Sequence, residues 1–191
     1  NGKAGWAEEP ARVCAEVGSR LGGRALPLHG AGGARVHVQA VGHAAAFNRL
    51  PRYPDDAKVK FDFNFDIKSV VAIAPVDAQY KPAGQFTPVE NVNYLVIHGS
   101  HDGDVSTFAG LRTYQRVRFT DGRPHFKAAV SMWRANHGQW NTVWNERDNG
   151  KQSARWLALG ELLPAGQQRE MAKVYLTAFL EASLKSETRW L

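Results

Sequence analysis

Two continuous runs of apolar residues restrict the possible folds of this chain more than any other feature of its sequence. Ser69–Ala74 (SVVAIA) ends at Pro75, and Tyr94–His98 (YLVIH) ends at Gly99. A strand with one face in water alternates apolar and polar residues, whereas a strand covered on both faces is apolar throughout. The two runs therefore predict strands of a parallel sheet that helices cover on both sides.

Further elements of the C-terminal two thirds agree with such a sheet. Phe126–Met132 predicts a third strand, parallel to the other two. We expect one helix over Ser106–Val117, with Ser106 as its N-cap, and an amphipathic helix over Gln167–Leu184. The fold class predicted is α/β, a three-layer arrangement of a parallel sheet with helices on both faces. The apolar side of the last helix is expected to contain Met171, Val174, Tyr175, Ala178, Phe179 and Ala182.

Composition places the chain among ordinary globular proteins. Of its 191 residues, 43% are hydrophobic and 22% are charged, which suits one domain with a single core. No apolar run approaches the roughly 20 residues that a membrane-spanning helix needs, so no membrane span is expected. Cys14 is the single cysteine, which excludes an intrachain disulfide and a cysteine-based zinc cluster and leaves the localisation unknown.

The positive charge of the chain is concentrated in one stretch. The net charge is +6, and residues 112–155 contain nine Lys or Arg against three acids, Asp121, Glu146 and Asp148. A basic stretch is one sign of nucleic-acid binding. This one lacks the motifs of the common nucleic-acid-binding modules, and its cations are dispersed among apolar residues. We therefore expect a solvated surface and no nucleic-acid partner.

Residues suited to catalysis follow the second and third predicted strands. Gly99–Val105 (GSHDGDV) contains Asp102, and Arg134–Trp140 (RANHGQW) contains His137. In open α/β sheets, ligands bind at the carboxyl ends of the strands. Acyl transfer uses a histidine that removes the proton of a nucleophile and an acid that fixes the tautomer of that histidine. Asp102 and His137 are therefore predicted to be catalytic residues within hydrogen-bond distance of each other.

This pattern resembles the C-terminal part of an α/β-hydrolase of the serine esterase and lipase type. Leu95–Gly99 followed by Asp102 and Val105 is similar to the acid-bearing loop of that family, and Ala135–Gly138 is similar to its histidine loop. The acid precedes the histidine, as in the family's order of serine, acid and histidine. The resemblance covers roughly residues 67 to 184. It implies ester hydrolysis through a serine-bound acyl intermediate, without a cofactor or a metal ion.

The chain departs from this family at the nucleophile. The motif Gly-x-Ser-x-Gly, which places the serine on a tight turn between strand and helix, does not occur in the sequence. Gly30 stands where the serine is expected, and Ser19 is the nearest substitute. Either the chain is a non-catalytic relative, or residues 1–43 do not represent a genuine N-terminal half, through truncation or a disturbed reading frame. Their Ala-, Gly- and Arg-rich composition favours the second explanation, so we expect residues 1–191 to form a single, incomplete α/β-hydrolase domain with a poorly matching N-terminal segment.

Several of these residues have alternative interpretations. Asp102 is also suited to capping the helix expected from Ser106, and Asp104 is the alternative acid of the triad. A metal site formed by His98, His101 and Asp102 is a further alternative, although no second cluster of ligands accompanies it.

Aromatic and acidic residues near these loops have weaker interpretations. Trp140 and Trp144 suit either the wall of an acyl pocket or ordinary packing, and Asp77 and Tyr80 are candidates for the edge of the cleft. Asp148–Gly150 predicts a turn, because the twelve-residue pattern of a calcium loop is absent.

The function expected is that of a carboxylic-ester (acyl) hydrolase-like protein that has Asp102 and His137 but no clear serine, and is inactive as given. A small-molecule or lipid ester is the substrate class expected, with the oligomeric state unknown. The alternatives are a non-catalytic ligand-binding relative and a module whose basic surface binds a polyanion.

Overall fold

Three parallel strands form the sheet of the computed structural model, which describes residues 67–77, 81, 84–86, 88–143, 148 and 162–190. In spatial order they are β1 (Ser69–Ile73), β2 (Asn93–Gly99) and β3 (Lys127–Met132). Both neighbouring pairs are parallel. The prediction of three neighbouring parallel strands is confirmed, with each boundary within one residue of the expected one.

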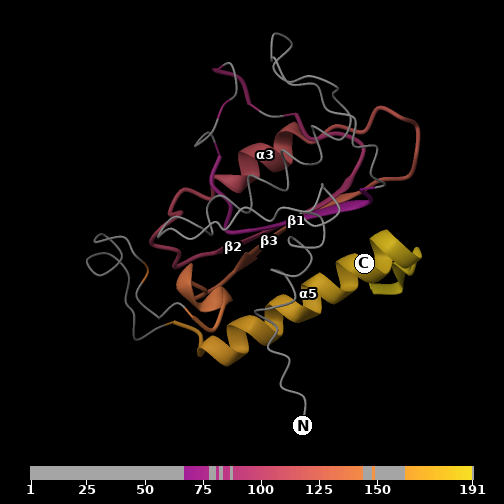
Figure 1. Cartoon of the computed structure of the whole chain (residues 1–191). Coiled ribbons are helices and arrows are strands. Elements are labelled where there is room, and N and C mark those ends of the chain that lie inside the picture. The colour runs from indigo at the N-terminus through magenta and orange to yellow at the C-terminus, as the bar shows by residue number, and fades with distance from the viewer. Residues whose placement is uncertain are drawn as a thin grey trace, which may run out of the picture.

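Helices lie on opposite faces of this sheet (Figure 1). The helix α3 (Gly110–Arg116) lies between β2 and β3 in the chain, and α5 (Ala165–Lys185) follows β3. Two short 3-10 helices, η2 (Gly138–Trp140) and η4 (Thr188–Trp190), complete the described elements. The described part of the chain is therefore a small α/β fold.

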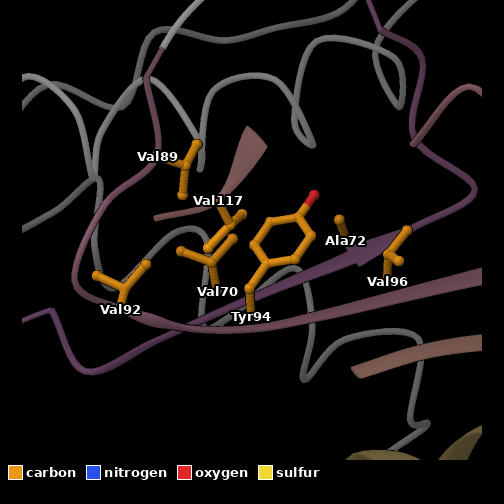
Figure 2. Packing of buried hydrophobic residues seen from close by; sticks show 7 residues of the cluster. All are labelled: Val70, Ala72, Val89, Val92, Tyr94, Val96 and Val117. Atoms are coloured by element: carbon orange, nitrogen blue, oxygen red, sulfur yellow. The ribbon is translucent and has the colours of Figure 1, made fainter. Parts of the chain in front are cut away.

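The two faces of β2 contribute to two separate apolar clusters. Tyr94 and Val96 point to the side of α3, and Leu95 and Ile97 point to the side of α5, because successive side chains of a strand alternate. This is why β2 is apolar throughout, and all of its residues are buried. The cluster on the α3 side is shown in Figure 2 and consists of Val70, Ala72, Val89, Val92, Tyr94, Val96 and Val117.

The helix α3 begins later than the sequence predicts. Ser106 lies exposed in a turn, and the helix begins at Gly110. The backbone N–H of Gly110 donates to His98 Nε2 over 3.1 Å. A Cβ atom at Gly110 would lie 2.3 Å from Cγ of Pro75, so only glycine permits this close approach. The start of α3 is thus set by contact with the strands, and Ser106 is not its N-cap.

The buried side of α5 agrees only in part with the predicted one: Phe179 and Ala182 are buried as expected. Met171, Val174 and Tyr175 were expected in the core, but they are 38%, 67% and 42% exposed. The apolar periodicity selected mainly large side chains, whereas the helix buries two alanines and the polar Gln168 beside Phe179. The residues of α5 that are buried are Gln168, Ala172, Phe179 and Ala182.

Candidate catalytic site

The loops that follow β2 and β3 leave the sheet at the same edge. The two strands are paired in register, with Gly99 opposite Met132. The acid loop (Gly99–Val105) and the histidine loop (Arg134–Trp140) therefore begin side by side, at the carboxyl ends of parallel strands. This is the position at which open α/β sheets bind ligands.

Backbone contacts join the two loops. The N–H of His101 donates to the carbonyl of Ala135 over 2.9 Å, and the N–H of Arg134 donates to Ser100 Oγ over 2.8 Å. A Cβ atom at Gly99 would lie 2.2 Å from the carbonyl oxygen of Ala135. Glycine at this position therefore allows the two backbones to approach closely.

Asp102 and His137 form a buried, hydrogen-bonded pair. Oδ2 of Asp102 lies 3.0 Å from Nδ1 of His137, and the two side chains are 1% and 7% exposed. The separation falls within the range of about 2.6–3.2 Å that general-base chemistry requires. The structure therefore confirms the predicted hydrogen-bond distance between the two residues.

The second carboxylate oxygen of Asp102 is bound within its own loop. The backbone N–H groups of Asp104 and Val105 donate to Oδ1 over 3.0 Å and 2.6 Å. These bonds close a turn inside the acid loop, whereas α3 begins only at Gly110. Asp102 therefore does not cap α3, and its orientation toward His137 is fixed by the residues that follow it.

The surroundings of His137 favour its protonated form. Burial lowers the pKa of His137, but the hydrogen bond and charge of Asp102, with the charges of Asp104 and Asp148, outweigh this and raise the pKa above its ordinary value. If Nδ1–H donates to Asp102, the lone pair of the neutral ring is on Nε2. The ring can then accept a proton at Nε2 while Asp102 stabilises the resulting imidazolium.

Gln168 of α5 connects the histidine loop to the helix, a role that was not predicted from the sequence. The residue is completely buried. Its Nε2 donates to the carbonyl of Asn136 over 2.9 Å, and its Oε1 accepts from the N–H of Asn136 over 3.1 Å. Gln139 Nε2 donates to the same Oε1 over 3.2 Å. The apolar pattern of the last predicted helix does not include this glutamine, so no signal in the sequence identified it.

Asp148 is a second residue whose role was not predicted, because the sequence around it indicated a turn. It is buried and accepts hydrogen bonds from the backbone N–H groups of Gly103, His137 and Gly138. Burial and the charge of Asp102 raise the pKa of the Asp148 carboxyl, and the three N–H donors lower it. The net effect is a pKa above the ordinary value for aspartate. The two residues that follow Asp148 lie outside the described residues.

His98 and His101 are engaged in hydrogen bonds within the protein and do not form the metal site considered for them with Asp102. His98 Nε2 accepts from Gly110, and His101 Nδ1 lies 2.9 Å from Ser100 Oγ. Burial lowers the pKa of His98, against the opposing charge of Asp102. Among the described residues, no group of three His, Cys, Asp or Glu side chains is arranged to hold a metal ion.

Four further residues were considered for the cleft, and the structure describes two of them, Asp77 and Trp140. Asp77 forms an ion pair with Arg116 of α3, which gives it a role in attaching that helix. Trp140 packs against the apolar cluster on the α5 side. Tyr80 and Trp144 lie outside the described residues.

Two serines lie near Asp102 among the described residues. Neither is described with its hydroxyl hydrogen-bonded to His137, as a nucleophile requires. Ser100 Oγ accepts from Arg134 and contacts His101, so it belongs to the contacts between the loops. Ser106 lies in an exposed turn. The glycine at the expected elbow, Gly30, and the substitute Ser19 lie outside the described residues, as does the whole segment 1–43.

Some cations of the basic stretch are bound by other groups of the protein where the structure describes it. Arg116 pairs with Asp77, and Lys127 Nζ donates to two backbone carbonyls. Among all the described residues, no helix is both long and apolar enough to cross a membrane. The exposed cations of the described part of this stretch are Arg112, Arg118, Arg123 and Arg134.

Comparison with known proteins gives no assignment, since no protein-family model, curated protein or solved structure matches the chain. Its function is therefore inferred from the geometry of the site.

Proposed function

We propose that this chain contains the acid–base pair of a carboxylic-ester hydrolase of the α/β-hydrolase type, in which Asp102 orients His137. The observation that supports this most is the 3.0 Å hydrogen bond between Asp102 Oδ2 and His137 Nδ1. The two residues lie on loops that follow neighbouring parallel strands, in the order acid and then histidine that the resemblance implies. Helices on opposite faces of the sheet agree with the layering of that fold.

In the proposed reaction, Nε2 of His137 accepts the proton of a serine hydroxyl as its oxygen attacks the carbonyl carbon of the ester. Asp102 holds the Nδ1–H and stabilises the imidazolium. His137 then gives its proton to the departing alcohol, and an acyl-serine remains. Water, activated by the same ring, attacks the acyl-serine, and a carboxylic acid and free serine are released. The substrate class proposed is a small-molecule or lipid ester.

The proposed reaction needs a hydroxyl within hydrogen-bond reach of His137. Gly30, at the position expected for the elbow, has no side chain that can attack. We therefore expect the chain as given to have no serine-esterase turnover. Removing a triad member leaves a residual acceleration of about 10³–10⁴ over water in known cases, from the oxyanion hole and substrate binding.

Two measurements test the proposal. One is labelling with a serine-directed fluorophosphonate probe, followed by mass mapping, and the other is turnover of a short acyl ester. The expected result is no stoichiometric adduct and no acyl-enzyme burst. Stoichiometric labelling of one serine that His137→Ala abolishes would support the acid–base pair, contradict the expected inactivity and identify the nucleophile. Labelling that His137→Ala leaves unchanged would contradict the role of His137.

A further inference from the structure

A buried carboxylate outside the proposed pair binds both loops of the site. Asp148 accepts hydrogen bonds from the backbone N–H of Gly103 in the acid loop and from those of His137 and Gly138 in the histidine loop. The side chain of Asn136 donates a further hydrogen bond. One carboxylate thus contacts three consecutive residues around the proposed base and one residue beside the proposed acid.

The donors are divided between the two oxygens of Asp148. Gly103 and His137 donate to Oδ2 over 2.7 Å and 3.1 Å. Gly138 and Asn136 donate to Oδ1 over 2.7 Å and 2.9 Å. An ionised carboxylate only accepts hydrogen bonds and has room for about four donors, so it suits this set of N–H groups. Asparagine would instead turn an NH₂ group toward two of these donors.

We infer that Asp148 is a positioning residue for His137, because it fixes the backbone of the histidine loop against the acid loop so that the imidazole faces Asp102. The inference rests on the proposed function of that pair. His137 is itself one of the donors, and both of its neighbours in the chain are bound to the same carboxylate. A shift of this segment would therefore move the ring relative to Asp102.

The charge of Asp148 supports the same role, because it acts on the ring of His137. It adds to the charges of Asp102 and Asp104 in raising the pKa of His137. His98 of β2 also interacts with His137, and burial lowers the pKa of His98. A residue that neither positioned His137 nor acted on its charge would leave the tautomer and titration of the ring unchanged. Among the described residues, the charged and titratable groups with interactions toward the histidine loop include Asp102, Asp104, Asp148, His98, His101 and Arg169, the last of which contacts the carbonyl of Gln139.

The test is a long-range nitrogen–proton NMR titration of the imidazole rings, on the isotope-labelled full chain through the neutral pH range, with His137→Gln to assign the signal. Asp148→Asn is expected to lower the pH at which His137 titrates and to mix its two neutral tautomers. Asp148→Glu keeps the charge but changes the reach, and its result is expected between those of the wild type and Asp148→Asn. The matched control is Asp121→Asn, which removes a carboxylate from an exposed turn and should leave His137 unchanged.

An unchanged midpoint and tautomer of His137 in folded Asp148→Asn would overturn the inference. The titration needs neither substrate nor nucleophile, so its outcome is independent of the fluorophosphonate result. An unexpected labelling result therefore leaves the titration test valid, and an unexpected titration result leaves the labelling test valid.

The wild-type chain supplies a second test that does not depend on the folding of Asp148→Asn. The amide protons of Gly103, His137 and Gly138 share one acceptor, so their chemical shifts should have one acidic midpoint in common as acid protonates Asp148, separate from the step in which the His137 ring titrates. Burial raises the pKa of this carboxyl, which places that midpoint above the ordinary value for aspartate. Amides whose acidic shifts have different midpoints, or that do not shift in acid, would overturn the inference.

Discussion

Asp102 in the acid loop and the residues around His137 in the histidine loop are oriented by different kinds of contact. In the acid loop, Asp102 is oriented by N–H groups two and three residues further along the chain. In the histidine loop, Asn136 is bound to Gln168, 32 residues away, and His137 to Asp102, 35 residues away. The carboxylate of Asp102 is thus oriented by its own loop, whereas His137 and its neighbour Asn136 are held by residues from distant parts of the chain. Substitutions of the distant partners should therefore affect stability more than changes near the acid.

The largest effect is expected from Gln168→Leu, which tests the long-range contacts. The substitution leaves the N–H and carbonyl of buried Asn136 without the partners that Gln168 supplies. Each unsatisfied buried group costs about 1–3 kcal/mol, so the free energy of unfolding should fall by about 3 kcal/mol in denaturant titrations. The control is Gln167→Leu, because Gln167 is exposed on the same helix and a surface change should stay within about 0.5 kcal/mol. Equal effects in the two variants would contradict the role of Gln168.

A smaller loss is expected where the two loops meet. Gly99→Ala places a Cβ against the backbone of Ala135, and overpacking of this kind costs about 1–3 kcal/mol. Thermal unfolding should show the loss. Gly166→Ala is the matched control in α5, since no atom lies within 4 Å of the added Cβ, and it should stabilise the helix by up to about 1 kcal/mol. A gain in stability for both variants would show that the loops are less closely apposed than described.

The smallest of these effects is pH-dependent and concerns the pair itself. The folded protein binds the proton of His137 more tightly than the unfolded chain does, because its pKa is raised by Asp102 despite burial. The stabilisation is therefore fully present below the ordinary pKa of 6.5 and is lost as the pH rises through the folded-state pKa. The difference in unfolding free energy between the wild type and His137→Gln should accordingly shrink from mildly acidic to alkaline pH. A difference that grows with pH would contradict the raised pKa.

The contrast between local and distant contacts also explains which parts of the fold were predictable. The strands were found to within one residue because continuous apolar runs such as Tyr94–His98 result from burial on both faces. Asp102 and His137 were predictable because each follows a recognisable strand. Their juxtaposition then follows from parallel pairing of the two strands.

The features that escaped prediction depend on residues far apart in the sequence. The start of α3 is set by the contact of Gly110 with His98, twelve residues earlier, so the cap expected at Ser106 was wrong. The buried side of α5 includes Gln168 because the histidine loop needs a polar partner, and apolar periodicity does not reveal this. Asp148 lies in a polar stretch that resembles a surface turn, and only the folded chain brings it to the loops.

The most direct measurement of the central claim is the NMR signal of the proton on Nδ1 of His137, recorded for the wild type, Asp102→Asn and Asp104→Asn. If Asp102 orients the ring, the neutral wild-type protein should have the Nδ1–H tautomer, with a proton strongly deshielded by its hydrogen bond. Asp102→Asn should remove that signal, and Asp104→Asn should retain it. A neutral ring protonated on Nε2, or a signal that Asp102→Asn preserves and Asp104→Asn abolishes, would contradict the claim that Asp102 and His137 act as the acid–base pair.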